Sequence, residues 1–140
     1  MASNFMLNIQ KFIDKAEGRA DLVVKKTALE LFTRVILKTP VDTGRARGNW
    51  NCAVGTKPAP RIDVNKLDKE GQESIAEAQK VILSGEAGKT IYLTNNLPYI
   101  EVLEDGHSQK QAPHGMVKVT VLEFQQVIDS VVNEVKGGSS

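Results

Sequence analysis

An apolar stripe with helical spacing runs through the C-terminal part of the chain and constrains the fold more than any other feature. Its members are spaced alternately by four and three positions: Val117, Val121, Phe124, Ile128, Val131 and Val135. This spacing places all of them on one side of an α-helix. Residues 117–121 also alternate as a strand would, but the longer stripe favours a helix. A helix with an apolar face needs a second layer to cover it.

Two more segments have helical spacing near the N-terminus. Residues 5–16 repeat apolar side chains at helical intervals between a cap at Ser3 or Asn4 and a terminator at Gly18, which predicts a first amphipathic helix. Residues 24–38 combine a broad apolar face with charged residues spaced by fours, which is typical of a second helix with a solvated side. This helix is expected to end at Thr39-Pro40, because the residue before proline is pushed out of the α region.

The middle of the chain predicts short strands and loops. Alternating apolar residues favour strands over 48–54 and 90–94, with Trp50 and Cys52 on the buried face of the first. We expect an exposed loop over 57–72, a helix over about 73–83, a helical turn over 98–106, an exposed loop over 107–115 and a flexible tail over 137–140. The fold class predicted is α+β, a single domain over 1–136 with long helices packed on a small, mainly antiparallel sheet.

The composition of the chain excludes several classes of protein. The sequence has no apolar run near the ~18 residues that cross a bilayer, and its first eleven residues lack the layout of a secretory signal, so we expect a cytoplasmic site of synthesis and no membrane partner. Cys52 is the only cysteine, which excludes an intrachain disulfide and a multi-thiolate metal site. Stability must therefore come from packing.

Charge is divided unevenly along the chain. Residues 1–70 hold 13 Lys+Arg against 8 Asp+Glu, giving +5, and residues 71–140 hold 5 against 9, giving −4. Both halves can belong to one domain and neutralise each other. Alternatively, the basic side of one subunit can meet the acidic side of a neighbour. The sequence leaves both interpretations open.

A protease is one candidate enzyme class. Asp42-Thr43-Gly44 matches the triplet of aspartic proteases, and residues 81–85 imitate their apolar-Gly element. Those enzymes bring two aspartates together in an all-β fold, whereas here the triplet follows a helix and the second element lies on a predicted helix. We therefore expect Asp42 to form a turn and Gly44 to supply a permissive backbone.

Other kinds of site have weak signals. A lone Cys52 on a buried strand face is more often an inert small hydrophobe than a nucleophile paired with His107 or His114. The seven-residue spacing of the two histidines is a poor metal signature, so no metal and no cofactor are expected. Basic clusters at 44–48 and 57–61 suggest DNA binding, but the net charge of +1 and 5% aromatic content argue against it. A DNA-binding accessory protein remains an alternative.

Three segments carry a family resemblance: TPVDTGRARGNW at 39–50, NNLPYIEVLEDGH at 95–107 and QAPHGMV at 111–117. Together they resemble the neck and tail-completion family of tailed phages, which includes the tail-completion protein of lambda-like phages. The resemblance implies a non-enzymatic virion protein at the head–tail junction, assembled in the host cytoplasm. It also implies a ring of identical subunits, hexameric or a multiple of six, in contact with other neck and tail proteins and with DNA passing nearby.

The resemblance and the charge division together suggest interface residues. Arg45 and Arg47 are the candidates on a basic side, and Glu101, Glu104 and Asp105 are those on an acidic side. Trp50 is expected to be a core or interface anchor, and the polar loop is expected to order on assembly. The full set of interface candidates is Arg45, Arg47, Trp50, Tyr99, Glu101, Glu104, Asp105, His107 and His114.

Overall fold

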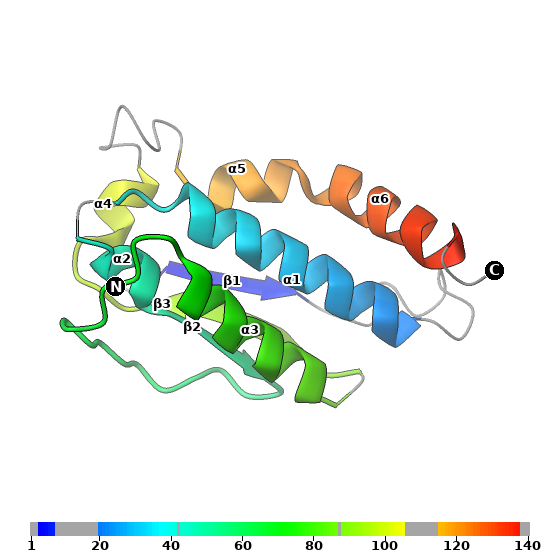
Figure 1. Cartoon of the computed structure of the whole chain (residues 1–140), viewed down its shortest axis with the longest axis horizontal. Coiled ribbons are helices and arrows are strands. Elements are labelled where there is room, and N and C mark those ends of the chain that lie inside the picture. Colours follow the sequence, from blue (N-terminus) through cyan, green and yellow to red (C-terminus); the bar gives the residue numbers. More distant parts are fainter. Residues whose placement is uncertain (1–2, 8–19, 42, 87, 106–114, 138–140) are drawn as a thin grey trace.

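The computed structural model describes residues 3–7, 20–41, 43–86, 88–105 and 115–137. Within these ranges, helices pack on an antiparallel sheet, which confirms the predicted α+β class (Figure 1). The elements in chain order are β1 (Ser3–Leu7), α1 (Ala20–Lys38), α2 (Arg45–Gly48), β2 (Trp50–Val54), α3 (Gln72–Ser84), β3 (Ile91–Asn95), α4 (Ile100–Glu104), α5 (Val117–Leu122) and α6 (Phe124–Gly137).

In the described part of the chain, the sheet has three antiparallel strands in the order β1–β3–β2. Asn95 at the end of the central strand lies opposite both Ser3 and Trp50. The helix predicted over 5–16 is therefore wrong for 5–7, which belong to a strand, while 8–19 lie outside the described residues. Helical spacing is a local signal, whereas this strand is formed by pairing with residues 91–95, far away in the sequence.

Helix α1 is the central element of the fold. It lies against the sheet with α3 on one side and the α5–α6 pair on the other (Figure 1). Positions on several of its faces are buried, and they are Val23, Val24, Thr27, Ala28, Leu31, Phe32, Val35 and Ile36. The predicted second helix is confirmed, and its broad apolar face serves three neighbouring elements at once.

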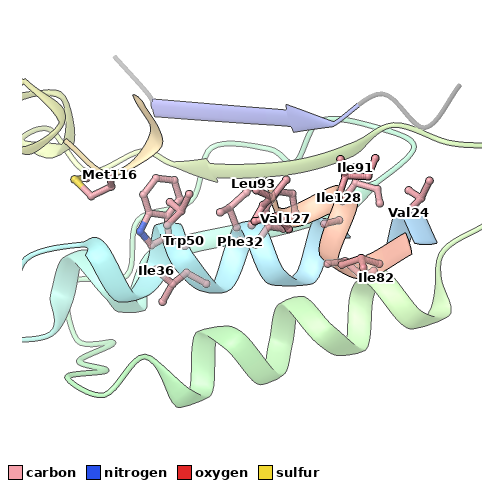
Figure 2. Packing of buried hydrophobic residues seen from close by; sticks show 14 of the residues in the cluster. Val24, Phe32, Ile36, Trp50, Ile82, Ile91, Leu93, Met116, Val127 and Ile128 are labelled. Atoms are coloured by element: carbon pink, nitrogen blue, oxygen red, sulfur yellow. The ribbon is translucent and has the colours of Figure 1, made fainter. Parts of the chain in front are cut away.

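The core between α1 and the sheet is built around Trp50, which is 2% exposed. Its ring lies near Phe32 and Leu93 in the space between helix and strands (Figure 2). Its Nε1 donates to Thr39 Oγ1 at 2.9 Å, and that hydroxyl donates to the Val35 carbonyl at 2.7 Å. The single polar atom of the indole is thus satisfied inside the core, and Trp50 is a core anchor rather than an exposed interface residue.

The C-terminal stripe forms two helices instead of one. Helix α5 ends at Leu122 and α6 begins at Phe124, with a turn at Glu123. The buried members of the stripe are Ile128, Val131 and Val135, all on α6, which packs on α1. Val121 is 51% exposed, so its predicted place on the apolar face is wrong. The turn at Glu123 interrupts the helical spacing, so Val121 is exposed while Val117, nearer the start of α5, still packs against the core.

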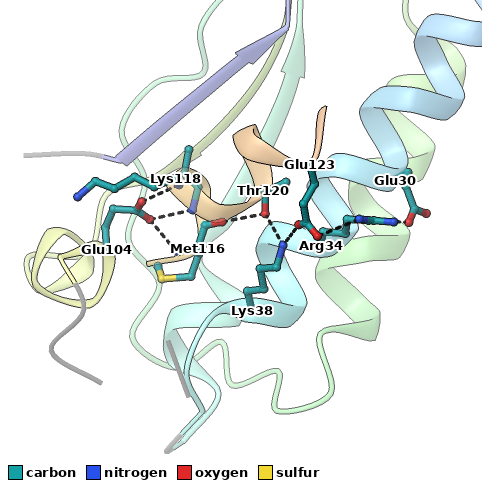
Figure 3. A network of polar contacts seen from close by, with 9 residues as sticks. Glu30, Arg34, Lys38, Glu104, Met116, Lys118, Thr120 and Glu123 are labelled. Carbon is teal, nitrogen blue, oxygen red and sulfur yellow. Dashed lines mark hydrogen bonds and ion pairs between the residues drawn. The ribbon is translucent and has the colours of Figure 1, made fainter. Parts of the chain in front are cut away.

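A polar network fastens this turn to α1 (Figure 3). The Glu123 carboxylate accepts a hydrogen bond from Lys38 Nζ and another from Arg34 Nη1 at 3.0 Å. Lys38 Nζ also lies 3.1 Å from Thr120 Oγ1, and Arg34 Nε donates to Glu30 at 2.9 Å. The hydrogen bond from Lys38 holds the pKa of the Glu123 carboxyl below its usual value.

The other predicted boundaries shift by a few residues. The strand expected from residue 48 begins at Trp50, after the short helix α2, and α3 begins at Gln72, the last residue of the predicted 57–72 loop. That loop has no regular element before α3 and is largely exposed, although Asp68 is 8% exposed and Gly71 is buried. Gly137 ends α6 rather than starting a tail. The loop predicted over 107–115 lies outside the described residues except for Gly115.

Replacing Trp50 tests the role of this core. Trp50→Ala should lower the free energy of unfolding by about 3–5 kcal/mol, because it removes a buried indole and leaves a cavity. Trp50→Phe is the matched control, since it keeps an aromatic ring and loses the bond to Thr39, with an expected loss of about 1–2 kcal/mol. Urea unfolding followed by circular dichroism measures both values. Equal stability of the alanine variant and the parent would contradict the assignment.

The Glu123 network predicts a pH dependence of stability. Because the folded pKa of Glu123 lies below its ordinary value of 4.5, the ionised form stabilises the fold above that pH. This contribution should be lost as the pH falls through the folded pKa. Glu123→Gln should therefore show a shallower decline of unfolding free energy below about pH 4.5. Lys38→Met, which removes the main donor, should flatten the same decline, and an unchanged slope in both variants would refute the linkage.

Candidate functional site

The first resembling segment folds into a cradle for the loop that follows β2. We name residues 57–69 the strap. A Cβ atom on Gly48 would lie 2.3 Å from the Lys66 carbonyl oxygen, and one on Gly44 would lie 2.6 Å from the backbone nitrogen of Lys69. Gly44 also has φ +91°, which other residues rarely adopt. Its predicted permissive backbone is confirmed, and both glycines allow the strap to approach the cradle closely.

Polar side chains of the cradle bind the main chain of the strap. Asn49 pairs with Asp63 twice: its Nδ2 donates to the carbonyl oxygen at 2.9 Å, and its Oδ1 accepts from the backbone nitrogen at 2.7 Å. Arg45 Nε donates to the Val64 carbonyl at 2.9 Å. The backbone nitrogen of Asp68 donates to the Gly44 carbonyl at 3.0 Å. The strap therefore has a fixed path although it has no regular secondary structure.

Arg47 joins the end of α1 to the strap. Its Nε and Nη2 donate to the carbonyls of Thr39 at 2.8 Å and Leu37 at 2.7 Å, and its Nη1 donates to the carbonyl of Lys69 at 2.8 Å. These bonds supply donors to carbonyls at the C-terminal end of a helix. Burial lowers the pKa of the Arg47 guanidinium. Arg47 thus has an intrachain role that the sequence did not reveal.

The second resembling segment meets the first at the end of the sheet. Asn95 lies opposite Trp50 in the strand register, and its Nδ2 donates to the Ala46 carbonyl at 2.9 Å. Its Oδ1 accepts from the Leu97 backbone nitrogen at 3.1 Å, which turns the chain toward α4. A pocket of about 280 Å³ separates α2 from α4, and its lining is Pro40, Thr43, Gly44, Arg45, Ala46, Tyr99 and Leu103.

Glu104 caps α5 from the end of α4. Its carboxylate accepts from the backbone nitrogens of Met116 at 3.0 Å, Val117 at 2.9 Å and Lys118 at 2.9 Å (Figure 3). The residue is only 9% exposed, so its predicted place on an exposed acidic surface is wrong. Gly115 permits this contact, because a Cβ there would lie 2.3 Å from the Glu104 carbonyl oxygen. Local sequence gave no signal for a cap that joins residues so far apart.

The remaining interface candidates differ in exposure. Asp105 is exposed and pairs with Lys118 at 3.2 Å, Tyr99 is 38% exposed, and Glu101 is partly buried. Asp42, His107 and His114 lie outside the described residues, so their roles remain predictions.

Ion pairs join the basic and acidic halves of the chain within one fold. Glu123 binds Lys38 and Arg34, while Lys26 pairs with Glu134 at 2.7 Å and Lys66 with Glu77 at 2.6 Å. Each pair joins a base from residues 1–70 to an acid from residues 71–140. The interpretation in which the two halves neutralise each other accounts for these charges.

The structure also bears on the other kinds of site considered from the sequence: a reactive cysteine, a protease, a metal site and a membrane span. Burial raises the pKa of the Cys52 thiol to about 12, so the reactive thiolate is scarce at neutral pH. Residues 81–84 of the protease-like element lie on α3, as expected. Among the described residues, no group of three His, Cys, Asp or Glu side chains could hold a metal ion. Nor does any helix in the described ranges have the length and apolar character to cross a membrane.

Comparisons of the chain with protein-family models, with curated proteins and with solved structures gave no significant match.

The Glu104 cap can be tested by comparing two acidic residues of the same short helix. Glu104→Ala should lower the free energy of unfolding by about 2–3 kcal/mol, because three backbone N–H groups lose their acceptor. Glu101→Ala is the matched control and should change it by less than about 0.5 kcal/mol. Thermal and urea unfolding measure both values. Similar losses in the two variants would show that the cap contributes little.

Proposed function

We propose that this chain is a structural subunit of the head–tail junction of a tailed phage, which assembles into a ring and joins the tail to the head. Its partners are copies of itself, hexameric or a multiple of six, and other neck and tail proteins. The ring forms in the host cytoplasm and remains in the virion, where DNA passes nearby without sequence-specific contact.

The observation that carries this proposal is the meeting of the two resembling segments at one end of the molecule. Their residues are separated by more than forty positions between Trp50 and Asn95, yet the two are paired across the sheet and Asn95 binds the Ala46 carbonyl. Their convergence supports treating them as one structural unit.

Support for a structural rather than catalytic role comes from how the charged groups near these motifs are used. Arg47 donates to carbonyls at the end of α1, and Glu104 accepts from the first N–H groups of α5. Both side chains hold main-chain segments of their own subunit in position. A catalytic charged group, in contrast, must keep its reactive atoms available to a substrate.

A labelled phage provides the direct test. The phage whose genome encodes this chain would carry a C-terminal epitope tag on it, and gold-labelled antibody would locate the tag in electron micrographs. Label is expected at the junction of head and tail. Deleting the gene should give filled heads and separate tails in place of joined particles, and supplying the parent chain from a plasmid should restore joining.

Other outcomes would favour the alternatives. Label elsewhere on the virion, or normal joined particles after deletion, would contradict the proposed role. Retention of the purified chain on DNA that weakens steeply with salt would favour a DNA-binding accessory protein. Cleavage of casein by the parent, abolished by Asp42→Asn, would favour an aspartic protease.

A further inference from the structure

The strap presents apolar side chains to solvent from a fixed backbone. Ile62, Val64 and Leu67 are 48%, 52% and 53% exposed, and they occur within six positions of one another. Hydrogen bonds from the cradle hold the main chain at Asp63 and Val64. A cluster of exposed apolar residues is a common sign of a protein-interaction site. A backbone already held in place loses little conformational freedom when a partner binds.

A second exposed apolar surface lies on α4 and α5. Val102 is 47% exposed, and Leu122 is 85% exposed. The ion pair between Asp105 and Lys118 ties the two helices together at 3.2 Å. Val102 precedes Asp105 by three positions and Leu122 follows Lys118 by four, so both apolar residues lie on the same helix faces as the ion pair. We name this surface the α4–α5 ridge; it consists of Glu101, Val102, Asp105, Lys118, Val121 and Leu122.

The strap and the α5 part of the ridge lie apart, and the two surfaces have opposite charge. The strap follows one edge of the molecule in Figure 1, below α3, while α5 lies along the other edge, beyond α1. The strap has four Lys+Arg against two Asp+Glu, giving +2; Lys66 pairs with Glu77 of its own chain, which leaves +1. The ridge has two acidic residues against one basic residue, giving −1. Two copies of the strap would therefore repel each other, whereas a strap and a ridge attract.

We infer that the strap of one subunit docks on the α4–α5 ridge of a second copy. Because the two surfaces are different, the contact is head-to-tail and can be repeated around a closed ring. The inference rests on the proposed function for the existence of that ring, and it adds which surfaces form it. Apolar contact between the strap and Leu122 supplies the attraction, and the opposite charges set the register.

This contact revises the predicted electrostatic pairing. Glu101 and Asp105 keep their place on the acidic side. On the basic side, the exposed strap residues Lys57 and Arg61 replace Arg47, whose donors bind carbonyls of its own chain.

Site-directed disulfide cross-linking tests the contact in the full-length chain. In a Cys52→Ala background, Leu67→Cys and Leu122→Cys are introduced together, and the protein is oxidised with copper phenanthroline. A head-to-tail contact should give a ladder of linked oligomers on non-reducing gels. Each single-cysteine variant alone should remain unlinked, and an equal mixture of the two should stop at dimers. Val64→Cys can replace Leu67→Cys on the strap, and Val102→Cys can replace Leu122→Cys on the ridge. These pairs test other alignments of the two surfaces.

A matched control uses Leu83, which is 57% exposed on α3 and belongs to neither surface. Leu83→Cys with Leu122→Cys should give no ladder. A dimer from the Leu122→Cys variant alone, as abundant as the products of the double variant, would overturn the head-to-tail arrangement. Rings seen by electron microscopy without any strap-to-ridge link would overturn this inference and leave the proposed function standing. Strap-to-ridge links found in a particle whose label lies away from the head–tail junction would support this inference and overturn the proposed function.

A charge substitution gives an independent measurement. Leu122→Lys should reduce the association constant between subunits by at least about tenfold, because it places a charge in an apolar contact. Its melting temperature should match that of the parent, since the side chain is 85% exposed in the single subunit. Leu83→Lys should leave association unchanged. Sedimentation equilibrium measures association, and equal weakening by both substitutions would contradict a specific role for the ridge.

Discussion

The burial of α1 on several sides is the constraint on which the rest of the structure depends. The sheet, α3 and α6 all pack on this helix, and its buried positions include Val24, Phe32 and Ile36. A small sheet needs a packed hydrophobic face to be stable, and helices obtain most of their stability from packing. Trp50 and Arg47 fix the C-terminal end of α1 through Thr39. The cradle, the strap and α4 are positioned from that end.

Buried and half-buried charges in this fold mostly stabilise its own main chain. Arg47 binds helix-terminal carbonyls, and Glu104 binds helix-initial N–H groups. Glu123 differs, because it binds the side chains of Arg34 and Lys38 and so fastens the α5–α6 turn to α1. Leaving such main-chain groups without partners in the interior would cost free energy. Much of the charge division between the two halves of the chain is consequently neutralised within the subunit. The proposed contact between subunits therefore relies on apolar surface more than on net charge.

The strap has no regular secondary structure, yet hydrogen bonds hold its backbone in place, as the proposed docking surface requires. Loops of this length are often mobile, and a mobile loop loses entropy when it binds. Here Gly44 and Gly48 admit the strap to the cradle, and Asn49 holds its backbone. Residues of segment 39–50 therefore set the path of a neighbouring loop. Arg45 and Arg47 of that segment donate hydrogen bonds to main-chain carbonyls of the strap, so they fix the path of the loop in addition to carrying charge.

The sequence by itself determined the elements whose apolar residues repeat over many positions, namely α1, α3 and the helical character of the C-terminal stripe. It also placed Trp50 in the core, because an alternating strand has one buried face. Only the tertiary structure decided the strand at 3–7, the turn at Glu123, the burial of Glu104 and the hydrogen bonds of Arg47 to its own main chain. Each of these depends on a partner distant in sequence: β3 for the first strand, Lys38 for the turn, and the start of α5 for Glu104. Periodicity reports which face of an element is apolar, whereas the fold alone determines what that face and its polar neighbours meet.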